Sequence, residues 1–278
     1  MPLSNLQIRV IAGFIFFPAL LLTTFDAPIF SLVMCVLLAL SWNEYLRFRH
    51  QPTNFGEWIN HYLKILLGSL PLLLMYFGFE VELGFALVAF SVQLSVIGSI
   101  IERGTIPALV EKMGFYILGI CYLTVLFSIL VLVQREYTGR QAIWFLLFVV
   151  GATDTGAYFV GKRAGKSPFF QNISPSKTQE GLLGGIASGI VVSILFYVVM
   201  SHYGFLIPKL WACIVLGIVI SVISAFGDLF ESMLKRFYGV KDSGSLIPGH
   251  GGILDRFDGV MFGVLPLYFF IVLRGGFR

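Results

Sequence analysis

The sequence predicts an all-α, polytopic integral membrane protein with about nine transmembrane helices and a cytoplasmic N-terminus. Of its 278 residues, 57% are hydrophobic and only 12% are charged, whereas about 25% of the residues of a soluble domain are charged. The apolar residues also occur in long runs, and a run of roughly 17 to 25 residues allows a helix to cross a bilayer. This composition excludes an ordinary soluble domain.

The first predicted helices form two close pairs. Residues 8–25 and 27–43 are separated by Asp26 alone, and residues 64–79 and 82–101 are separated by a turn of two residues. Each pair is therefore expected to form a helical hairpin.

Further apolar runs of spanning length follow, separated by short polar segments. The predicted spans are residues 115–133, 142–160, 182–200, 210–227 and 257–273. None of the polar segments is long enough to build a hydrophobic core of its own, so no soluble domain is predicted.

The distribution of positive charge predicts the orientation, because cytoplasmic loops collect Lys and Arg. If the N-terminus is cytoplasmic, most basic residues fall on its side of the membrane. The exceptions are Arg135, Arg140, Lys209, Arg274 and Arg278. This asymmetry accounts for the net charge of +4, so the charge does not indicate a nucleic-acid partner.

Polar side chains share one helix face where the run 210–227 ends. Asp228, Glu231, Ser232 and Lys235 have the spacing i, i+3, i+4 and i+7, which places them together on a helix. A solvated helix with local ion pairs would explain Lys235. It explains Asp228 poorly, because a carboxylate beside the bilayer is costly unless it is paired, hydrated or bound to a metal.

A glycine-rich loop leads from this face to the last predicted helix. Its glycines are Gly244, Gly249, Gly251 and Gly252. They allow positive φ angles, so that backbone N–H groups can point at phosphate oxygens, although the loop can also simply separate two helices. The loop ends in Asp255 and Asp258, whose hard oxygen atoms suit Mg²⁺. His250 lies in the same loop and is a candidate phosphate contact.

A third polar segment occupies residues 152–181. Asp154 lies inside a predicted span, and an intramembrane carboxylate is a functional candidate by default; the alternative is a structural pair with a buried base. Lys166 belongs to a basic loop of the kind that usually contacts anionic headgroups.

The end of this segment combines small hydroxyl donors with a lysine. The residues concerned are Ser174, Lys177, Thr178 and Glu180. They either cap the helix that follows or hold a triphosphate, and both interpretations stay open at this point.

The segment from Ser232 to Asp258 resembles the signature of the phosphatidate cytidylyltransferases (CDP-diacylglycerol synthases). The matching residues are Ser232, Lys235, Arg236, Lys241, Asp242, Pro248, Gly249, His250, Gly251, Gly252, Asp255, Arg256 and Asp258. The stretches Asp154–Tyr158 and Ser174–Gly181 also resemble that family. The resemblance is specific over residues 151–260, and the short chain looks like a bacterial member.

This resemblance implies transfer of CMP from CTP to phosphatidic acid, with release of pyrophosphate, as a step of phospholipid biosynthesis. It implies Mg²⁺ bound by Asp228 and Asp255, with Glu231 and Asp258 in or beside the same site, and it allows a second, monovalent ion such as K⁺. The catalytic candidates are Asp228, Asp255, Lys235, Arg236, Lys241, His250 and Arg256. The substrate-binding candidates are Asp154, Lys166, Ser174, Lys177, Thr178, Glu180, Ser232, Gly249, Gly251 and Gly252.

The expected location is the inner (plasma) membrane of a bacterium, with the active site facing the cytoplasm. Residues 1–141 would form a transmembrane scaffold, and residues 142–278 would form the catalytic region, because nearly all the chemically versatile residues lie there. Gly184, Gly185 and Gly189 on one predicted helix favour close helix contact and suggest a homodimer face.

Three alternatives remain. A CTP-dependent polyprenol or lipid kinase would transfer the γ-phosphate instead of CMP. An ion-coupled transporter would use Asp154 and Asp228, but matched broken helices in the two halves, which such transporters tend to have, are not visible. A CDP-alcohol phosphotransferase is disfavoured because its run of acidic residues on a helix pair is missing.

Overall fold

The computed structural model describes residues 17–101, 104–244, 246 and 251–277. It contains two compact units, one formed by residues 26–131 and the other by residues 132–277 with residues 17–25. The scaffold role of the first part of the chain and the catalytic role of the second stay predictions.

The described residues contain eight helices, one of them continuous across a π-helical turn, that are long and apolar enough to cross a membrane. Their bounds are α2 (Ala27–Arg49), α3 (Phe55–Tyr76), α4 (Val81–Ile101), α5 to α6 (Ile106–Arg135, with a π-helical turn at Ile120–Val125), α7 (Gly139–Ala164), α8 (Gln179–His202), α9 (Leu210–Phe237) and α10 (Leu254–Arg274). Each overlaps a predicted span, which confirms the polytopic all-α class. The first half of the remaining predicted span, 8–25, lies outside the described residues, and residues 17–23 are helical.

The unit of residues 26–131 has an aromatic core. Trp42 on α2 is fully buried, and its indole N–H donates to Thr124 Oγ1 at 3.1 Å. The Thr124 hydroxyl donates in turn to the Gly68 carbonyl oxygen on α3 at 2.6 Å. A buried indole N–H needs such a partner, so this chain of hydrogen bonds joins three helical segments at one level.

In the other unit, α8 packs against α7 and α9 through glycines. Gly181, Gly185 and Gly189 are buried on one face of α8, and a Cβ at Gly185 would lie 2.8 Å from the Thr153 carbonyl oxygen. Thr153 on α7 and Ser221 on α9 share a buried hydrogen bond of 2.8 Å beside Gly189. Small residues and hydroxyl pairs of this kind hold membrane helices close together.

The glycine-based argument for a homodimer is therefore wrong. Gly184, Gly185 and Gly189 approach Val160, Thr153 and Ser221 of the same chain, so their close contacts are made within one unit. A homodimer formed through another surface stays a prediction.

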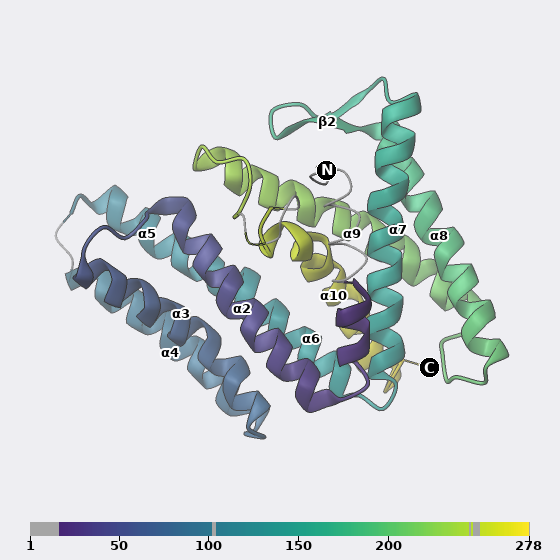
Figure 1. The fold of residues 1–278 in the computed structure, drawn as a ribbon, viewed down its shortest axis with the longest axis horizontal. Helices are drawn as coiled ribbons and strands as arrows, with labels where there is room; N and C mark the ends of the chain where they lie inside the picture. The colour runs from purple at the N-terminus through teal and green to yellow at the C-terminus, as the bar shows by residue number, and fades with distance from the viewer. Residues whose placement is uncertain (1–16, 102–103, 245, 247–250, 278) are drawn as a thin grey trace, which may run out of the picture. The chain divides into compact units, whose positions relative to one another are not determined.

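Two short strands interrupt the otherwise helical structure. β1 (Pro168–Phe170) and β2 (Ser174–Thr178) pair in antiparallel fashion and form a hairpin at the end where α7 finishes and α8 begins (Figure 1). The sequence predicts a loop for this segment, and the two strands correct that prediction. Strands of three and five residues are too short to produce a clear alternating pattern.

Candidate functional site

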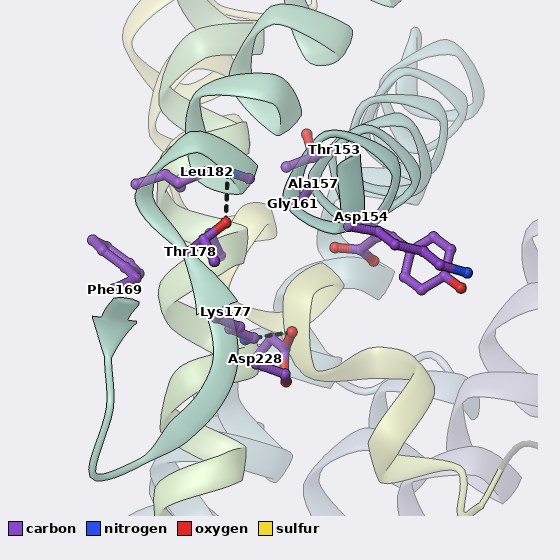
Figure 2. A pocket seen from close by; sticks show the side chains of 14 residues that line it. Thr153, Asp154, Ala157, Gly161, Phe169, Lys177, Thr178, Leu182 and Asp228 are labelled. Atoms are coloured by element: carbon purple, nitrogen blue, oxygen red, sulfur yellow. Dashed lines mark hydrogen bonds and ion pairs between the residues drawn. The ribbon is translucent and has the colours of Figure 1, made fainter. Parts of the chain in front are cut away.

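A cavity of about 510 Å³ lies between α7, α8, α9 and the hairpin. Its wall is made by Thr153, Asp154, Ala157, Tyr158, Gly161, Lys162, Phe169, Ser176, Lys177, Thr178, Gly181, Leu182, Ala225 and Asp228. The wall thus combines apolar side chains with two cations, two carboxylates and several hydroxyl groups. Figure 2 shows how these side chains lie.

Lys177 and Asp228 form an ion pair inside this cavity. The Lys177 Nζ atom lies 2.5 Å from Asp228 Oδ2, and Figure 2 shows the two side chains meeting between β2 and α9. Asp228 Oδ1 also accepts a long hydrogen bond of 3.5 Å from the Ser232 hydroxyl. Both charged side chains keep partial exposure, 28% for Lys177 and 38% for Asp228, so a ligand in the cavity can reach either of them.

Asp154 lines the same cavity from α7. Its side chain is exposed. The negative charge of Asp154 is repelled by those of Asp228 and Asp258 and attracted by the positive charge of Lys177. The cavity wall is therefore charged on more than one side. The roles of Asp154, Lys177 and Asp228 stay predictions.

Asp255 occupies a second polar cluster, at the start of α10. Its Oδ1 atom accepts a hydrogen bond of 2.5 Å from Lys235 Nζ on α9. Its Oδ2 atom accepts from the backbone N–H of Ser243 at 2.9 Å, from the Ser243 hydroxyl at 2.7 Å and from the Gly252 N–H at 2.9 Å. Gly251 has a φ angle of +80°, which favours glycine, and a Cβ there would lie 2.5 Å from Asp255 Oδ2. The carboxylate thus organises the loop before α10.

Glu231 is fully buried beneath this cluster. Lys235 Nζ lies 3.4 Å from Glu231 Oε1, but neither carboxylate oxygen has a hydrogen-bond partner by distance and angle within the described residues. Asp258 on α10 adjoins Glu231 closely enough for their charges to interact. Two neighbouring carboxylates, one buried and one half-buried, repel each other unless a proton or a cation lies between them.

The structure separates the predicted residues into groups. Asp154, Lys177, Thr178 and Asp228 line the cavity, whereas Glu231, Lys235, Asp255 and Asp258 form the cluster between α9 and α10. The side chains of Lys166, Arg236, Lys241 and Arg256 are exposed outside the wall of the cavity. Gly249 and His250 lie outside the described residues.

Two of the predicted substrate-binding residues have structural contacts. The Thr178 hydroxyl accepts a hydrogen bond of 3.1 Å from the Gly181 N–H and caps α8, which confirms the capping interpretation. Glu180 accepts from the backbone N–H groups of Lys166 at 3.1 Å and Ser167 at 3.2 Å, so it ties the end of the α7–hairpin loop to the start of α8. Ser174 is half-buried on β2.

Several wall residues are not predicted from the sequence, namely Tyr158, Lys162, Phe169 and Ser176. Their contribution depends on the hairpin folding back beside α9, where the Phe169 ring lies 6.1 Å from the ring of Phe226. The adjacent Phe169 and Phe170 next to a lysine-rich loop were the available signal.

Within the described parts of the chain, no group of three or more His, Cys, Asp or Glu side chains is close enough together to hold one metal ion. Mg²⁺ in proteins typically takes one or two carboxylates and completes its shell with water and substrate phosphates. Metal binding by Asp228, Glu231, Asp255 and Asp258 stays a prediction.

A family model and several named relatives are similar to this chain, and all of them are cytidylyltransferases. Residues 7–274 match the model of a family described as the cytidylyltransferase family. A phosphatidate cytidylyltransferase from Bacillus subtilis is 38% identical over 185 residues, which cover 66% of each chain. Proteins with the same name from Staphylococcus saprophyticus and Staphylococcus aureus are 42% and 38% identical over 161 and 163 residues, and the matched stretch covers 59% of the length of the former. The matched part is thus slightly less than two thirds of these relatives.

Proposed function

Because the chain belongs to the cytidylyltransferase family, we propose that it transfers CMP from CTP to phosphatidic acid and releases CDP-diacylglycerol and pyrophosphate. The names of its relatives in Bacillus and Staphylococcus support this choice of substrates. So does the location of the cavity in a unit whose helices are long and apolar enough to span a membrane, since one substrate is a lipid and the other is soluble.

The observation that carries the proposal is the Lys177–Asp228 pair inside the 510 Å³ cavity. A cavity of this size falls within the range of small-molecule sites, about 300 to 1,000 Å³. Nucleotide phosphates need a cation, and a divalent ion that accompanies them needs a carboxylate; the pair supplies one of each. The two groups lie close enough to neutralise each other.

The proposed reaction is an in-line substitution at phosphorus. A phosphate oxygen of phosphatidic acid attacks the α-phosphorus of CTP and forms a new P–O bond. The bond from the α-phosphorus to the oxygen that bridges to the β-phosphorus breaks, and pyrophosphate leaves with that electron pair. A phosphate monoester is largely dianionic near pH 7, since its second pKa is about 6, so no strong general base is needed. Catalysis then depends on positioning and on neutralising negative charge.

The residues of the cavity are suited to this task. Lys177 and Lys162 are the cations in its wall and would bind phosphate oxygens of the substrates. Lys177 would exchange Asp228 for phosphate as the nucleotide enters. Lys235, Arg236, Lys241 and Arg256 remain proposed sources of positive charge near the leaving group, and His250 remains a proposed phosphate contact.

The donor set beside the cavity fits a divalent cation. Glu231 and Asp258 are neighbouring carboxylates whose charges interact, and Glu231 is fully buried. Asp228 interacts electrostatically with Asp258. We propose that Mg²⁺ is held by carboxylates from this set, which includes Asp255, and that it supplies charge neutralisation for the phosphates when it is bound. A monovalent ion such as K⁺ is a further proposed cofactor.

The proposed membrane is the inner membrane of a bacterium, with the cavity on the cytoplasmic side, where CTP is available. The excess of Lys and Arg in the loops that follow α7 and α9 supports this orientation.

The decisive test uses purified protein in detergent with phosphatidic acid, Mg²⁺ and CTP labelled at the α-phosphate. The proposal expects the label to enter the lipid phase and pyrophosphate to appear in equal amount. If only a γ-phosphate label enters the lipid, the protein is a CTP-dependent lipid kinase. If neither label enters phosphatidic acid or a polyprenol, the enzymatic proposal is wrong.

A further inference from the structure

One side of the candidate active site is made by successive turns of α7. Asp154, Tyr158 and Lys162 follow one another at intervals of four residues, a spacing that places side chains one above another on a helix. All three line the cavity. In the proposed function Lys162 binds phosphate, whereas Tyr158 has no role yet. An aromatic ring one turn away from a phosphate-binding lysine is a candidate for contact with the rest of a nucleotide.

The ring of Tyr158 is accessible to a ligand. The Lys162 Nζ atom lies over one face of the ring, 5.6 Å from its centroid, and a single cation covers that face alone. The neighbouring Phe159 ring makes a T-shaped contact, with 5.4 Å between the two centroids. Tyr158 nevertheless stays 60% exposed, so another planar ring has room to stack on it.

An exposed tyrosine near the end of a spanning helix can also serve as a contact for lipid headgroups. Its neighbour Phe159 is exposed as well, but it lines a separate groove whose wall is made mainly by α7 and α8. Tyr158 instead shares the cavity wall with Lys177 and Asp228. The helix thus presents two adjacent aromatic residues to different surfaces, and of the two the tyrosine belongs to the charged cavity.

Phe169 supplies a second aromatic ring among the described residues of the wall. It lies 6.1 Å from the ring of Phe226, in a purely apolar contact that suits hydrocarbon. Figure 2 shows Phe169 and Asp154 on opposite sides of the Lys177–Asp228 pair. The cavity therefore has an apolar end at the hairpin and, on α7, an end that combines a ring with a cation.

A nucleotide has the matching parts, a flat base joined through a ribose to a chain of phosphates. From this arrangement we propose that Tyr158 is the stacking platform for the base of CTP. The base lies on the ring face opposite Lys162, and the phosphates extend along the wall towards Lys177. Every base has a π-face, so stacking tolerates any base; Tyr158 contributes affinity and not the choice of cytosine.

This inference rests on the proposed function, because it takes CTP as the substrate. It concerns binding of the base, so it holds equally if the γ-phosphate is the group transferred. The phosphate contacts of Lys177 and the base contact of Tyr158 can be measured separately, because inorganic tripolyphosphate carries the phosphates of CTP without its ribose and base.

The test is isothermal titration calorimetry of the purified protein in detergent with Mg²⁺ and without phosphatidic acid. The titrants are CTP and tripolyphosphate. Tyr158→Leu should weaken CTP binding about ten-fold, the scale expected for the loss of one base–aromatic stack, and should leave tripolyphosphate binding unchanged. Tyr158→Phe keeps the ring and should bind CTP as the unmodified protein does.

Phe159→Leu is the matched control. It removes the adjacent exposed ring from the same helix, and CTP binding should not change because Phe159 lines the separate groove. Lys177→Gln should weaken binding of CTP and of tripolyphosphate alike. In turnover assays Tyr158→Leu should raise KM for CTP with little change in kcat, as expected for an interaction of equal strength in the ground and transition states.

Four results would overturn the inference. Unchanged CTP binding in Tyr158→Leu, or an equal loss in Phe159→Leu, would show that the base is held elsewhere. An equal loss of CTP and tripolyphosphate affinity in Tyr158→Leu would show that the substitution acts on the phosphate site. These three results would leave the proposed function standing. If the unmodified protein binds no CTP, the proposed function and this inference are both wrong.

Discussion

Lys177 on β2 and Asp228 on α9 lie within 2.5 Å of each other, and their pairing attaches the hairpin to the helix that carries the acidic face. The two residues are distant in sequence but share the wall of one cavity. The ion pair can have two roles. It can attach the hairpin to α9, or it can supply the cation and the carboxylate of the proposed site for a nucleotide and its metal ion.

Exchanging the two charges separates these roles. Lys177→Gln should lower kcat/KM about 100-fold, the usual cost of removing one group that stabilises charge in a transition state. Lys177→Gln should also lower the melting temperature, because it breaks the ion pair. The double variant Lys177→Asp with Asp228→Lys restores an ion pair, so its melting temperature should return to that of the unmodified protein while its activity stays low. Recovery of activity in the double variant would show that the pair is only structural.

Lys235 is predicted to be important for folding. Its side chain is 12% exposed and contacts both Asp255 and Glu231. Lys235→Met would leave two carboxylates without their shared cation, and removing one partner of a buried pair costs roughly 3 kcal/mol or more. Denaturant-induced unfolding in detergent should show this loss. Lys209→Met is the control, because Lys209 is exposed; an equal effect in both variants would contradict the prediction.

The glycine face of α8 gives a matched pair of substitutions. Gly185→Ala brings a methyl group to 2.8 Å from the Thr153 carbonyl oxygen and should destabilise the protein by about 1 to 3 kcal/mol, the range for overpacking. Gly151→Ala on α7 meets no atom within 4 Å and should be neutral or slightly stabilising, since Ala is the better helix former. Thermal unfolding of the two variants checks the sign of each effect. Equal behaviour would mean that α7 and α8 are not in close contact.

Removing one carboxylate between α9 and α10 should change stability and activity in opposite directions. Removal of Mg²⁺ with EDTA should abolish CMP transfer, and added Mg²⁺ should restore it. Asp258→Asn should raise the melting temperature without metal, because it relieves repulsion with the adjoining Glu231, and should raise the Mg²⁺ concentration needed for activity. Glu82→Gln, at an exposed position of α4, serves as control. A lower melting temperature in Asp258→Asn would argue against a repulsive pair.

The spanning helices could be predicted from the sequence because their evidence is local. A run of apolar residues long enough to cross a bilayer must satisfy its backbone hydrogen bonds internally, and a helix does so within the run itself. The shared face of Asp228, Glu231 and Lys235 followed for the same reason, since α9 continues through all three residues. The signature around Asp255 also identified the family without any knowledge of the fold.

Contacts between residues that are distant in the chain could not be predicted from the sequence. The sequence placed Asp228 and Asp255 at one proposed metal site, but packing paired Asp228 with Lys177 and Asp255 with Lys235. The glycines of α8 signalled close packing, yet only the folded chain showed that α7 and α9 are their partners. The cavities depend on which side chains face one another across helices. The sequence by itself determined the membrane-spanning elements, the family and the identity of the reactive groups. The tertiary structure decided which of these groups meet, because contacts between distant segments depend on the packing of whole helices.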